Sequence, residues 1–600
     1  MSSLWTTAHD FGQKIDLCVR LREILRNYPE GLSIFKELIQ NADDAGADMI
    51  RFCIHEPRRQ DEHAAATTTT DPLYPIFQGP SLLVYNSGIF TKDDFASIQN
   101  IGDSIKKGTD KTGRFGLGFN STYHLTDIPM FVSGSKIVLL DPHATYIPGI
   151  NPINPGKLID FSTLEGQTLI QSFPYIFKPM EIFGCSFQTK SIHEFHGTLF
   201  QFPLRSPHQA TISRLSNRSY TLESIRLLLE DLSDQAADML LFLRNIQRIE
   251  VYDWKKELDQ PTLLSYTEIS NGKDIHTQRS KIPTPLTSGN SHVVDYTLHI
   301  ECFGLNYNNN MTKKKSEVWI VCYQLGGGNA SKMAYDPTHS HMKLIPLASV
   351  ATRVKPSLME NDSGTAYCFL PLPLKTSLNI HVNGYFELSS NRRDLWWGSD
   401  MMGDGQVRAD WNKALLQDIA APCYGRLIEQ CIRSGYVTPE TYEFLLPRTH
   451  DIAEPWKWLA RCFFQYMNDR PILYSHCSNI WIAPREAYAL ENLDDMSIVK
   501  TLPIFNIALV ISRKDNSHSL LDEWPGMNHV SLPTLIIKHI IPFLGSVPID
   551  TVLVAMKEIL LHTRNLLHLD SDLQAFFSTA KIIPSLATNT LKCPAEVGSC

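Results

Sequence analysis

The stretch FKELIQNADDAGADMIRF, residues 35–52, predicts a helix that leads into a strand. Successive helical residues turn by about 100°, so residues three and four apart share a face. The apolar residues lie together on one face: Phe35, Leu38, Ile39 and Ala42. The polar residues are expected on the opposite side, about one turn apart: Glu37, Asn41, Asp44 and Asp48. This amphipathic helix is the starting point for both fold and function.

The charges of this helix are unusual, because four carboxylates face a single basic residue, Lys36. Like charges four residues apart cost about 0.2–0.5 kcal/mol on an exposed helix, and asparagine is a poor residue for a helix interior. A solvated face is the common interpretation of such a pattern. A phosphate group with Mg²⁺ explains it better: Asn41 would ligate the cation, and Glu37 would polarise a water molecule. Asp43 and Asp48 receive no role.

A second motif, TGRFGLGFNSTY at residues 112–123, predicts a glycine-rich loop that enters a helix. Gly113, Gly116 and Gly118 would leave backbone N–H groups free to cradle phosphates. The motif is neither GxxxxGK[ST] nor GxGxxG, because Ser121 stands at the last position of the latter. The upstream SIKKGTDK contains Lys106, and it is compatible with a mobile lid or with a solvated loop.

Composition describes an ordinary globular protein of 600 residues, with 43% hydrophobic and 20% charged residues. This length predicts about two to four domains. The net charge of −8 disfavours nucleic-acid binding, and no apolar stretch is long enough to span a membrane. The 12 cysteines form no CxxC pair and no zinc-ligand spacing. We therefore expect a cytoplasmic protein with free thiols.

Patterns along the chain predict three regions. Residues 1–205 read as an α+β domain, a mixed sheet covered by helices, with strands at 136–141 and 197–205. Residues 206–405 open with a helical pattern and continue with several strand-like runs, which predicts a second α+β domain. Residues 406–600 are richer in helical patterns, and their ending shows no terminating signal, so we expect the chain to be truncated.

The order and spacing of these motifs resemble the Bergerat-fold ATPases, the superfamily of gyrase, Hsp90, histidine kinases and MutL. ELIQNADDA matches the first motif, YNSGIF the position of the D-x-G motif, GRFGLGF the glycine motif, and the GT of GTLFQFPLR the last one. Longer stretches, including EILRNYPEGLSIFKELIQNADDAGA and CFLPLPLKTSLNIHVNGYFELSSNRRDLW, are similar to the sacsin family, whose repeats begin with an Hsp90-like ATPase domain. The resemblance covers most of the chain, strongly over 12–205.

The resemblance implies a set of site residues. Glu37 takes the position of the general base, and Asn41 that of the Mg²⁺ ligand. The remaining nucleotide-contacting positions are Asp44, Ala45, Asn86, Gly88, Lys106, Gly113, Gly116, Gly118, Phe119 and Thr198. A cation from the second domain would complete the site, and Arg392 and Arg393 are the candidates. This Arg pair would equally brace Trp396 and Trp397 or pair with Asp394.

One position departs from the superfamily pattern, because Asn86 stands where the D-x-G aspartate accepts a hydrogen bond from adenine. An amide oxygen accepts the same bond without the charge that roughly doubles its strength. The family resemblance implies a chaperone-related module that uses ATP and Mg²⁺, with slow hydrolysis, serving folding or quality control with Hsp70-type co-chaperones and client proteins. The alternative is a non-catalytic interaction scaffold that binds nucleotide weakly or not at all. Enzymatic activity is left open.

Overall fold

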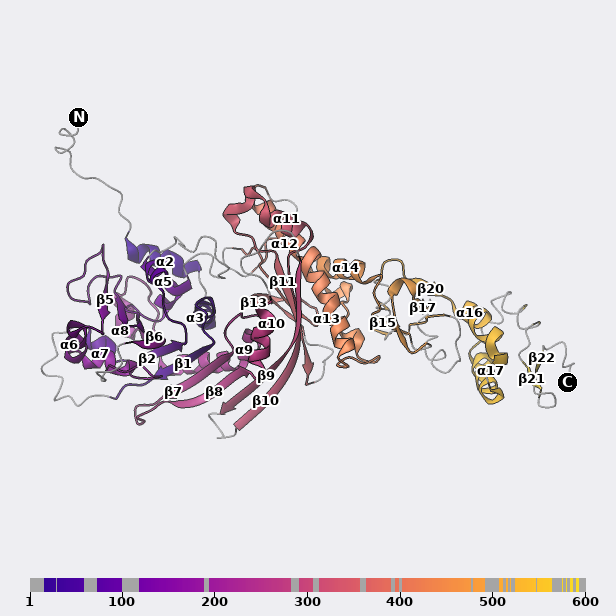
Figure 1. Ribbon diagram of the computed structural model, residues 1–600, viewed down its shortest axis with the longest axis horizontal. Helices are drawn as coiled ribbons and strands as arrows, with labels where there is room; N and C mark the ends of the chain where they lie inside the picture. The colour runs from indigo at the N-terminus through magenta and orange to yellow at the C-terminus, as the bar shows by residue number, and fades with distance from the viewer. Residues whose placement is uncertain are drawn as a thin grey trace, which may run out of the picture.

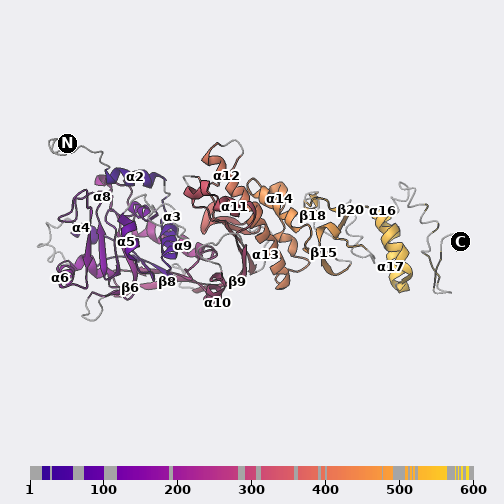
Figure 2. The same ribbon diagram turned by 45° about the horizontal axis from the view of Figure 1, so that its top comes forward.

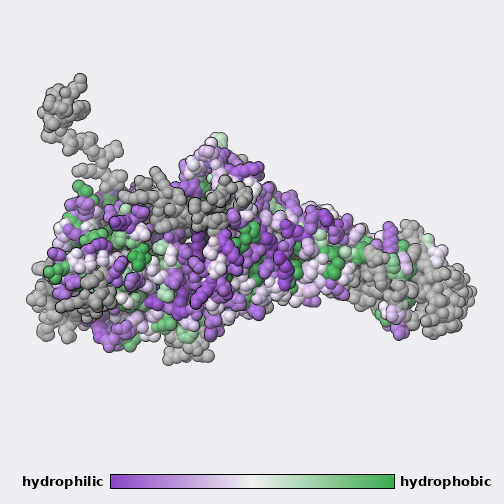
Figure 3. All heavy atoms as spheres, viewed as in Figure 1, coloured by the Kyte–Doolittle hydropathy of each residue, from purple (hydrophilic) through white to green (hydrophobic). Residues whose placement is uncertain are grey.

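The computed structural model describes residues 16–27, 30–58, 73–99, 118–187, 194–281, 291–305, 312–356, 363–389, 394–398, 402–475, 478–490, 507–510, 514–515, 518–519, 524–546, 548–563, 575, 579, 583–585 and 590–592. The molecule is elongated, and the chain runs from one end of the long axis to the other (Figure 1, Figure 2). No helix among these residues is long and apolar enough to cross a membrane. Hydrophilic residues predominate over the middle of the face drawn in Figure 3.

Fourteen strands of the described chain form one continuous sheet. Their order across the sheet is β13 (Leu370–Lys375), β12 (Thr365–Cys368), β14 (His381–Gly384), β11 (Leu347–Lys355), β10 (Thr312–Leu325), β9 (His292–Leu305), β8 (Thr262–Ile269), β7 (Arg248–Trp254), β1 (Met49–His55), β2 (Ser81–Asn86), β6 (Phe195–Pro203), β3 (Met130–Gly134), β4 (Lys136–Leu140) and β5 (Gly156–Asp160). Neighbours pair antiparallel except β1 with β7 and β12 with β14. The β1–β7 pair therefore joins the sheets of the two predicted α+β domains.

Helices cover both faces of this sheet. Those in the first half of the chain are α2 (Leu17–Asn27), α3 (Leu32–Asp44), α4 (Tyr74–Phe77), α5 (Lys92–Gln99), η2 (Gly118–His124), α6 (Leu164–Ser172), α7 (Pro174–Phe177), η3 (Lys178–Met180), α8 (Pro207–Ile212), α9 (Leu222–Leu240) and α10 (Gly272–Arg279). Helices α3 and α9 pack on one face, with α6 and α7 on the other. The α+β fold class with a mixed, helix-covered sheet is thus confirmed.

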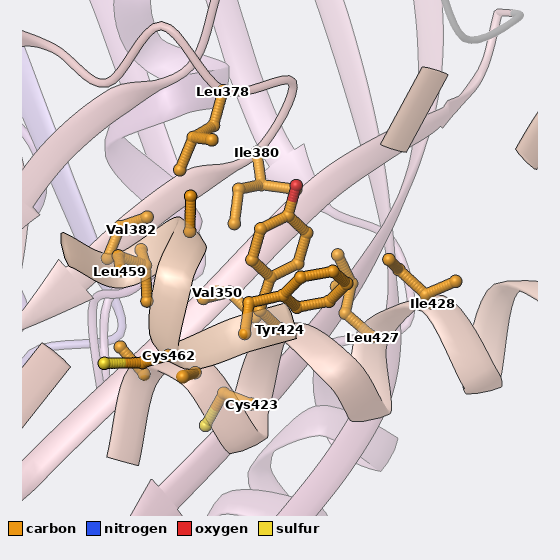
Figure 4. Close-up of a cluster of buried hydrophobic side chains, with 14 of the residues drawn as sticks. Val350, Leu378, Ile380, Val382, Cys423, Tyr424, Leu427, Ile428, Leu459 and Cys462 are labelled. Atoms are coloured by element: carbon orange, nitrogen blue, oxygen red, sulfur yellow. The ribbon is translucent and has the colours of Figure 1, made fainter. Parts of the chain in front are cut away.

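Strand β10 shows how one strand serves two cores. Trp319 and Val321 point into the core beneath α9, whereas Ile320 and Cys322 point into a second core on the opposite face. This follows from the two-residue period of a strand. In the second core, Tyr424 of α13 and side chains from α14 pack on Val350 of β11 and its neighbours (Figure 4).

The helices of the second half are α11 (Gly328–Tyr335), η4 (Pro337–Met342), α12 (Asp404–Leu415), the π-helical turn η5 (Leu416–Ala420), α13 (Ala421–Arg433), η6 (Tyr442–Leu445), η7 (Thr449–Asp451) and α14 (Trp456–Met467). Smaller elements follow: β15 (Leu473–Ser475), β16 (Ile480–Ile482), η8 (Pro484–Glu486), β17 (Tyr488–Leu490), β18 (Lys514–Asp515), β19 (His518–Ser519), β20 (Asn528–Val530), α16 (Leu532–Leu535), η11 (Ile536–Ile540), η12 (Ile541–Ser546), α17 (Ile549–Thr563), β21 (Ile583–Ser585) and β22 (Thr590–Lys592). The predicted helix-rich region therefore also contains short two-stranded pairs.

Candidate functional site

Helix α3 is the centre of the candidate site. It begins after Gly31, whose φ of +82° suits a residue without a side chain, and its buried face packs against the sheet. The opposite face leaves Glu37 half-buried and Asn41 exposed. The helix therefore presents both predicted catalytic and metal-ligating residues on its outer side.

Gly118, the last glycine of the glycine motif, meets this face of α3. Gly118 opens η2, and a Cβ atom on it would lie only 2.2 Å from Oε2 of Glu37 and 3.7 Å from Nδ2 of Asn41. Any side chain at position 118 would thus displace the carboxylate of Glu37. The backbone at Gly118 therefore lies against the two predicted phosphate-side residues.

The turn after β2 meets the C-terminal end of the same helix. A Cβ atom on Gly88 would lie 3.2 Å from both Cβ and the carbonyl oxygen of Ala45. The N–H of Gly88 donates to Oδ1 of Asn86 at 3.0 Å, and the Asn86 side chain is buried. The amide of Asn86 is therefore oriented by its own turn, with its oxygen toward Gly88.

Thr198 of β6 fastens this turn to the sheet. Its hydroxyl donates to the carbonyl oxygen of Gly88 at 2.7 Å and lies 2.8 Å from the hydroxyl of Ser133. Asn86, Thr198 and Ser133 occupy neighbouring positions on β2, β6 and β3. Ser133, which also accepts from the N–H of Phe90 at 2.8 Å, was not predicted, because a single serine in an apolar strand carries no motif.

The remaining predicted residues divide into two groups. The ring of Phe119 lies 6.0 Å from that of Phe200 and packs into the core beneath α3, so its side chain serves packing. Lys106, Gly113, Gly116, Arg392 and Arg393 lie outside the described residues. One interpretation of the Arg pair was that it braces Trp396 and Trp397. In the structure, Arg408 of α12 lies over the ring of Trp396 and Lys413 over that of Trp397, each 5.7 Å from the ring centre.

The segment after Asn41 corrects one sequence-based argument. Helix α3 ends at Asp44, and Gly46 follows with a φ of +78°, so Asp48 does not continue the helical face and makes no i,i+4 pair with Asp44. Asp48 instead accepts from the hydroxyl of Ser87 at 2.5 Å, and its own N–H donates to that oxygen at 2.9 Å. It thereby holds the turn that contains Gly88.

Asp43, for which the sequence suggested no role, is buried in the structure. Its carboxylate accepts the backbone N–H groups of Arg244, Asn245 and Ile246 at 3.0, 2.7 and 2.9 Å. Burial raises the pKa of Asp43 above its ordinary value, and the three N–H donors oppose that rise. Asp43 therefore anchors α3 to the segment that connects α9 to β7, rather than facing a ligand.

A buried ion pair supports η2 from behind. Arg205 is fully buried and donates through Nε and Nη2 to Oδ1 of Asp127 at 2.9 and 2.6 Å. It also donates to the carbonyl oxygens of Tyr123 and His124 at the end of η2. Because one planar group donates both to Asp127 and to these carbonyl oxygens, it fixes the end of η2 relative to Asp127.

Comparison with known proteins agrees with this architecture. Residues 14–265 match the family described as the Sacsin domain. This part of the chain is a Sacsin domain, and the chain is a sacsin-like protein, as the sequence motifs predicted. Among curated proteins it is similar to Sacsin of Homo sapiens, with 33% identity over 453 residues that cover 71% of this chain. The chain spans about 9% of the length of that relative.

Two solved structures show a distant likeness to the chain. The N-terminal domain of a DNA repair protein matches with a TM-score of 0.24 and 12% identity, over 51% of this chain and 70% of that one. The 43K ATPase domain of Thermus thermophilus gyrase B, in complex with an aminocoumarin, matches with a TM-score of 0.19 and 11% identity, over 46% and 60%. Neither likeness is close enough to support an argument about function.

Proposed function

We propose that the Sacsin domain of this chain binds ATP with Mg²⁺ on the outer face of α3. The observation that carries the proposal is the convergence of two distant glycine motifs on one helix. Gly118 meets Glu37 and Asn41 along the middle and last turn of α3, and Gly88 meets Ala45 just past its C-terminal end. Such close backbone approach is what a phosphate cradle and a nucleotide-binding turn require.

The phosphate end would be formed by Glu37, Asn41 and the backbone that begins at Gly118. An amide oxygen beside a carboxylate suits a hard cation such as Mg²⁺, which prefers oxygen ligands and keeps several waters. Bound there, the cation would supply charge neutralisation for the phosphates. Asn41 would orient the phosphate group, and Glu37 would accept the proton of an attacking water molecule. Hydrolysis is expected to be slow.

The base end would be formed by Asn86, Gly88 and Thr198, with Asp44 and Ala45 beneath the nucleotide. Oδ1 of Asn86 already accepts the N–H of Gly88, and a carbonyl oxygen retains a second lone pair for an exocyclic amino group. Thr198 fixes the turn through the carbonyl of Gly88. The neutral amide predicts weaker binding than a carboxylate would give.

The sacsin resemblance supports a wider role for this site. We propose that the nucleotide site belongs to a chaperone-related module in the cytoplasm that assists folding or quality control, together with Hsp70-type co-chaperones and client proteins. The family match over residues 14–265 supports this proposal.

A second candidate is a non-catalytic scaffold that keeps the fold and binds nucleotide weakly or not at all. One observation favours it. The side chain of Asn86, at the D-x-G position, is neutral, and its oxygen already accepts the N–H of Gly88 within its own turn. The variant Asn86→Asp, which restores the charge, distinguishes the two candidates. The ATP-binding candidate predicts that it tightens nucleotide binding by about the energy of one hydrogen bond, roughly tenfold, and the scaffold predicts no such change.

The melting temperature of the full chain, measured against increasing Mg·ATP, tests binding. With a Kd of about 0.1 mM, 1 mM nucleotide stabilises the folded state by about 1.4 kcal/mol, which raises the melting temperature by a few degrees. Asn41→Ala should abolish the rise, and Asn217→Ala, at an exposed loop position, should keep it. No shift in the wild type at millimolar nucleotide contradicts the proposal.

Phosphate release tests hydrolysis separately. Glu37→Ala should remove release while the nucleotide-induced rise in melting temperature survives, because Glu37 acts on water and not on binding. Release that continues unchanged in Glu37→Ala would assign the activity to another base.

A further inference from the structure

Helix α3 touches the second half of the sheet through a residue that the nucleotide proposal does not use. Lys36, the neighbour of Glu37, is half-buried, and its Nζ donates to the carbonyl oxygen of Pro371 in β13 at 3.1 Å. Burial lowers the pKa of Lys36, and the charge of Asp238 on α9 opposes that shift. A partly buried amine needs polar partners, and the carbonyl oxygen of Pro371 and the charge of Asp238 supply them here.

Asp43 provides a second connection from the far end of the same helix. Its carboxylate holds three consecutive N–H groups of residues 244–246, and Nδ2 of Asn245 donates back to the Asp43 carbonyl at 2.8 Å. In addition, the N–H of Gln247 donates to the carbonyl oxygen of Asp48 at 2.7 Å. The segment 244–247 therefore follows any displacement of the end of α3.

The segment that Asp43 holds also contacts the part of the sheet that Lys36 reaches. The guanidinium of Arg244 lies 5.1 Å from the ring centre of Phe369, in the hairpin formed by β12 and β13. The ring of Phe242 lies 4.8 Å from that of Tyr367 in the same hairpin. Helix α3, the segment 242–247 and this hairpin thus form a closed ring of contacts, with Lys36 and Asp43 as its two attachments on α3.

We propose that Lys36 and Asp43 couple α3 to the β12–β13 hairpin, so that a nucleotide bound on α3 reduces the mobility of residues 365–375. The inference rests on the proposed nucleotide site. A ligand that restrains Glu37 and Asn41 restrains the helix that carries Lys36 and Asp43, and the ring transmits the restraint. Strand β13 of this hairpin is an edge strand of the sheet, and hydrogen exchange reports local opening of such a segment directly.

Coupling of this kind is a difference in free energy between two sites and is therefore reciprocal. If the nucleotide steadies the hairpin, anything that steadies the hairpin must raise nucleotide affinity by the same factor. In the whole protein, a partner that covers residues 365–375 would consequently control nucleotide affinity without touching the nucleotide.

Hydrogen exchange of the full chain with and without Mg·ADP tests the proposal, using peptides that cover 365–375. In the wild type we expect bound nucleotide to slow exchange there by about fivefold or more, the lower end of ordinary coupling. Lys36→Met removes the donor and keeps the aliphatic stem, so binding should survive while the slowing is lost. Lys36→Arg should restore it, and Lys92→Met, at an exposed position of α5, should leave it intact.

The possible outcomes distinguish a failure of the coupling from a failure of the nucleotide site. Slowing in Lys36→Met that equals that of the wild type overturns the coupling. So does a wild type whose melting temperature rises with nucleotide while exchange at 365–375 stays constant. A wild type with no rise in melting temperature overturns the nucleotide site itself, and the coupling with it.

Discussion

Removal of the Asp43 carboxylate should destabilise the protein far more than its place in an acidic stretch suggests. In Asp43→Ala, the N–H groups of Arg244, Asn245 and Ile246 lose their acceptor, the last in a buried environment and the first two in a partly buried one. Each orphaned buried donor costs about 1–3 kcal/mol. Water can reach the two partly buried donors, so the predicted loss in the free energy of unfolding is at the low end of the sum, about 3 kcal/mol.

Asp43→Asn refines this expectation, because the amide oxygen can replace only one of the two carboxylate oxygens. Oδ1 serves Asn245 and Ile246, and Oδ2 serves Arg244. The amide therefore satisfies two N–H groups and opposes the third with its own N–H. We expect a loss between that of the alanine variant and zero, about 1–2 kcal/mol.

Calorimetry of the full chain provides the assay. For a cooperative unit of 150–250 residues, about 3 kcal/mol corresponds to a fall of about 6–12 °C in melting temperature. Amide exchange of a peptide that covers 241–248 should accelerate in parallel. Asp234→Ala, at an exposed position of α9, is the matched control. A loss below about 1 kcal/mol, or equal to that of the control, would refute the assigned role of Asp43.

Three further outcomes are expected. Burial lowers the pKa of His55 to about 4, against about 6.5 in the unfolded chain. Because the unfolded state therefore binds the proton first as pH falls, the free energy of unfolding should decrease by about 3 kcal/mol between pH 6.5 and pH 4. His55→Phe should flatten that part of the stability–pH curve in urea titrations, and an unchanged slope would contradict the assignment. Arg205→Lys should cost about 3–5 kcal/mol of stability in thermal unfolding, because one ammonium cannot replace a guanidinium that serves Asp127 and several carbonyls; a loss under 1 kcal/mol would show that the pair is dispensable. Gly118→Ala should push the Glu37 carboxylate aside by about 1 Å and lower phosphate release by about 10²-fold with binding retained, whereas equal loss of binding and release would mean that the whole loop had moved.

The residues proposed for the site were chosen from local motifs, and the structure brings several of them together. Glu37 and Asn41 lie on one side of α3, and Gly88, Gly118 and Thr198 come from three other segments that the structure brings to that helix or its turn. Glu37 and Asn41 were predicted from helical spacing and Gly118 from its glycine-rich loop, whereas Gly88 and Thr198 came from the family resemblance.

What the sequence did not reveal depends on partners far along the chain. The acceptor role of Asp43 requires N–H groups about 200 residues away, and the parallel pairing of β1 with β7 joins two regions that the sequence separates. Asp48 was placed on the helix because the periodicity continues through it. Gly46 ends the helix, and a glycine just past the last turn is the signal that identifies this stop.

Equilibrium dialysis of the full chain against labelled ATP tests the central claim most directly. The proposed site predicts about one bound nucleotide per chain, with a Kd in the range of about 10 μM to 1 mM, because the neutral Asn86 replaces a charged acceptor. Binding should fall at least about tenfold when Mg²⁺ is chelated and in Asn41→Ala, and it should tighten in Asn86→Asp. Retention of no ATP at millimolar concentration, or binding that is indifferent to Asn41→Ala, would contradict a nucleotide site on α3.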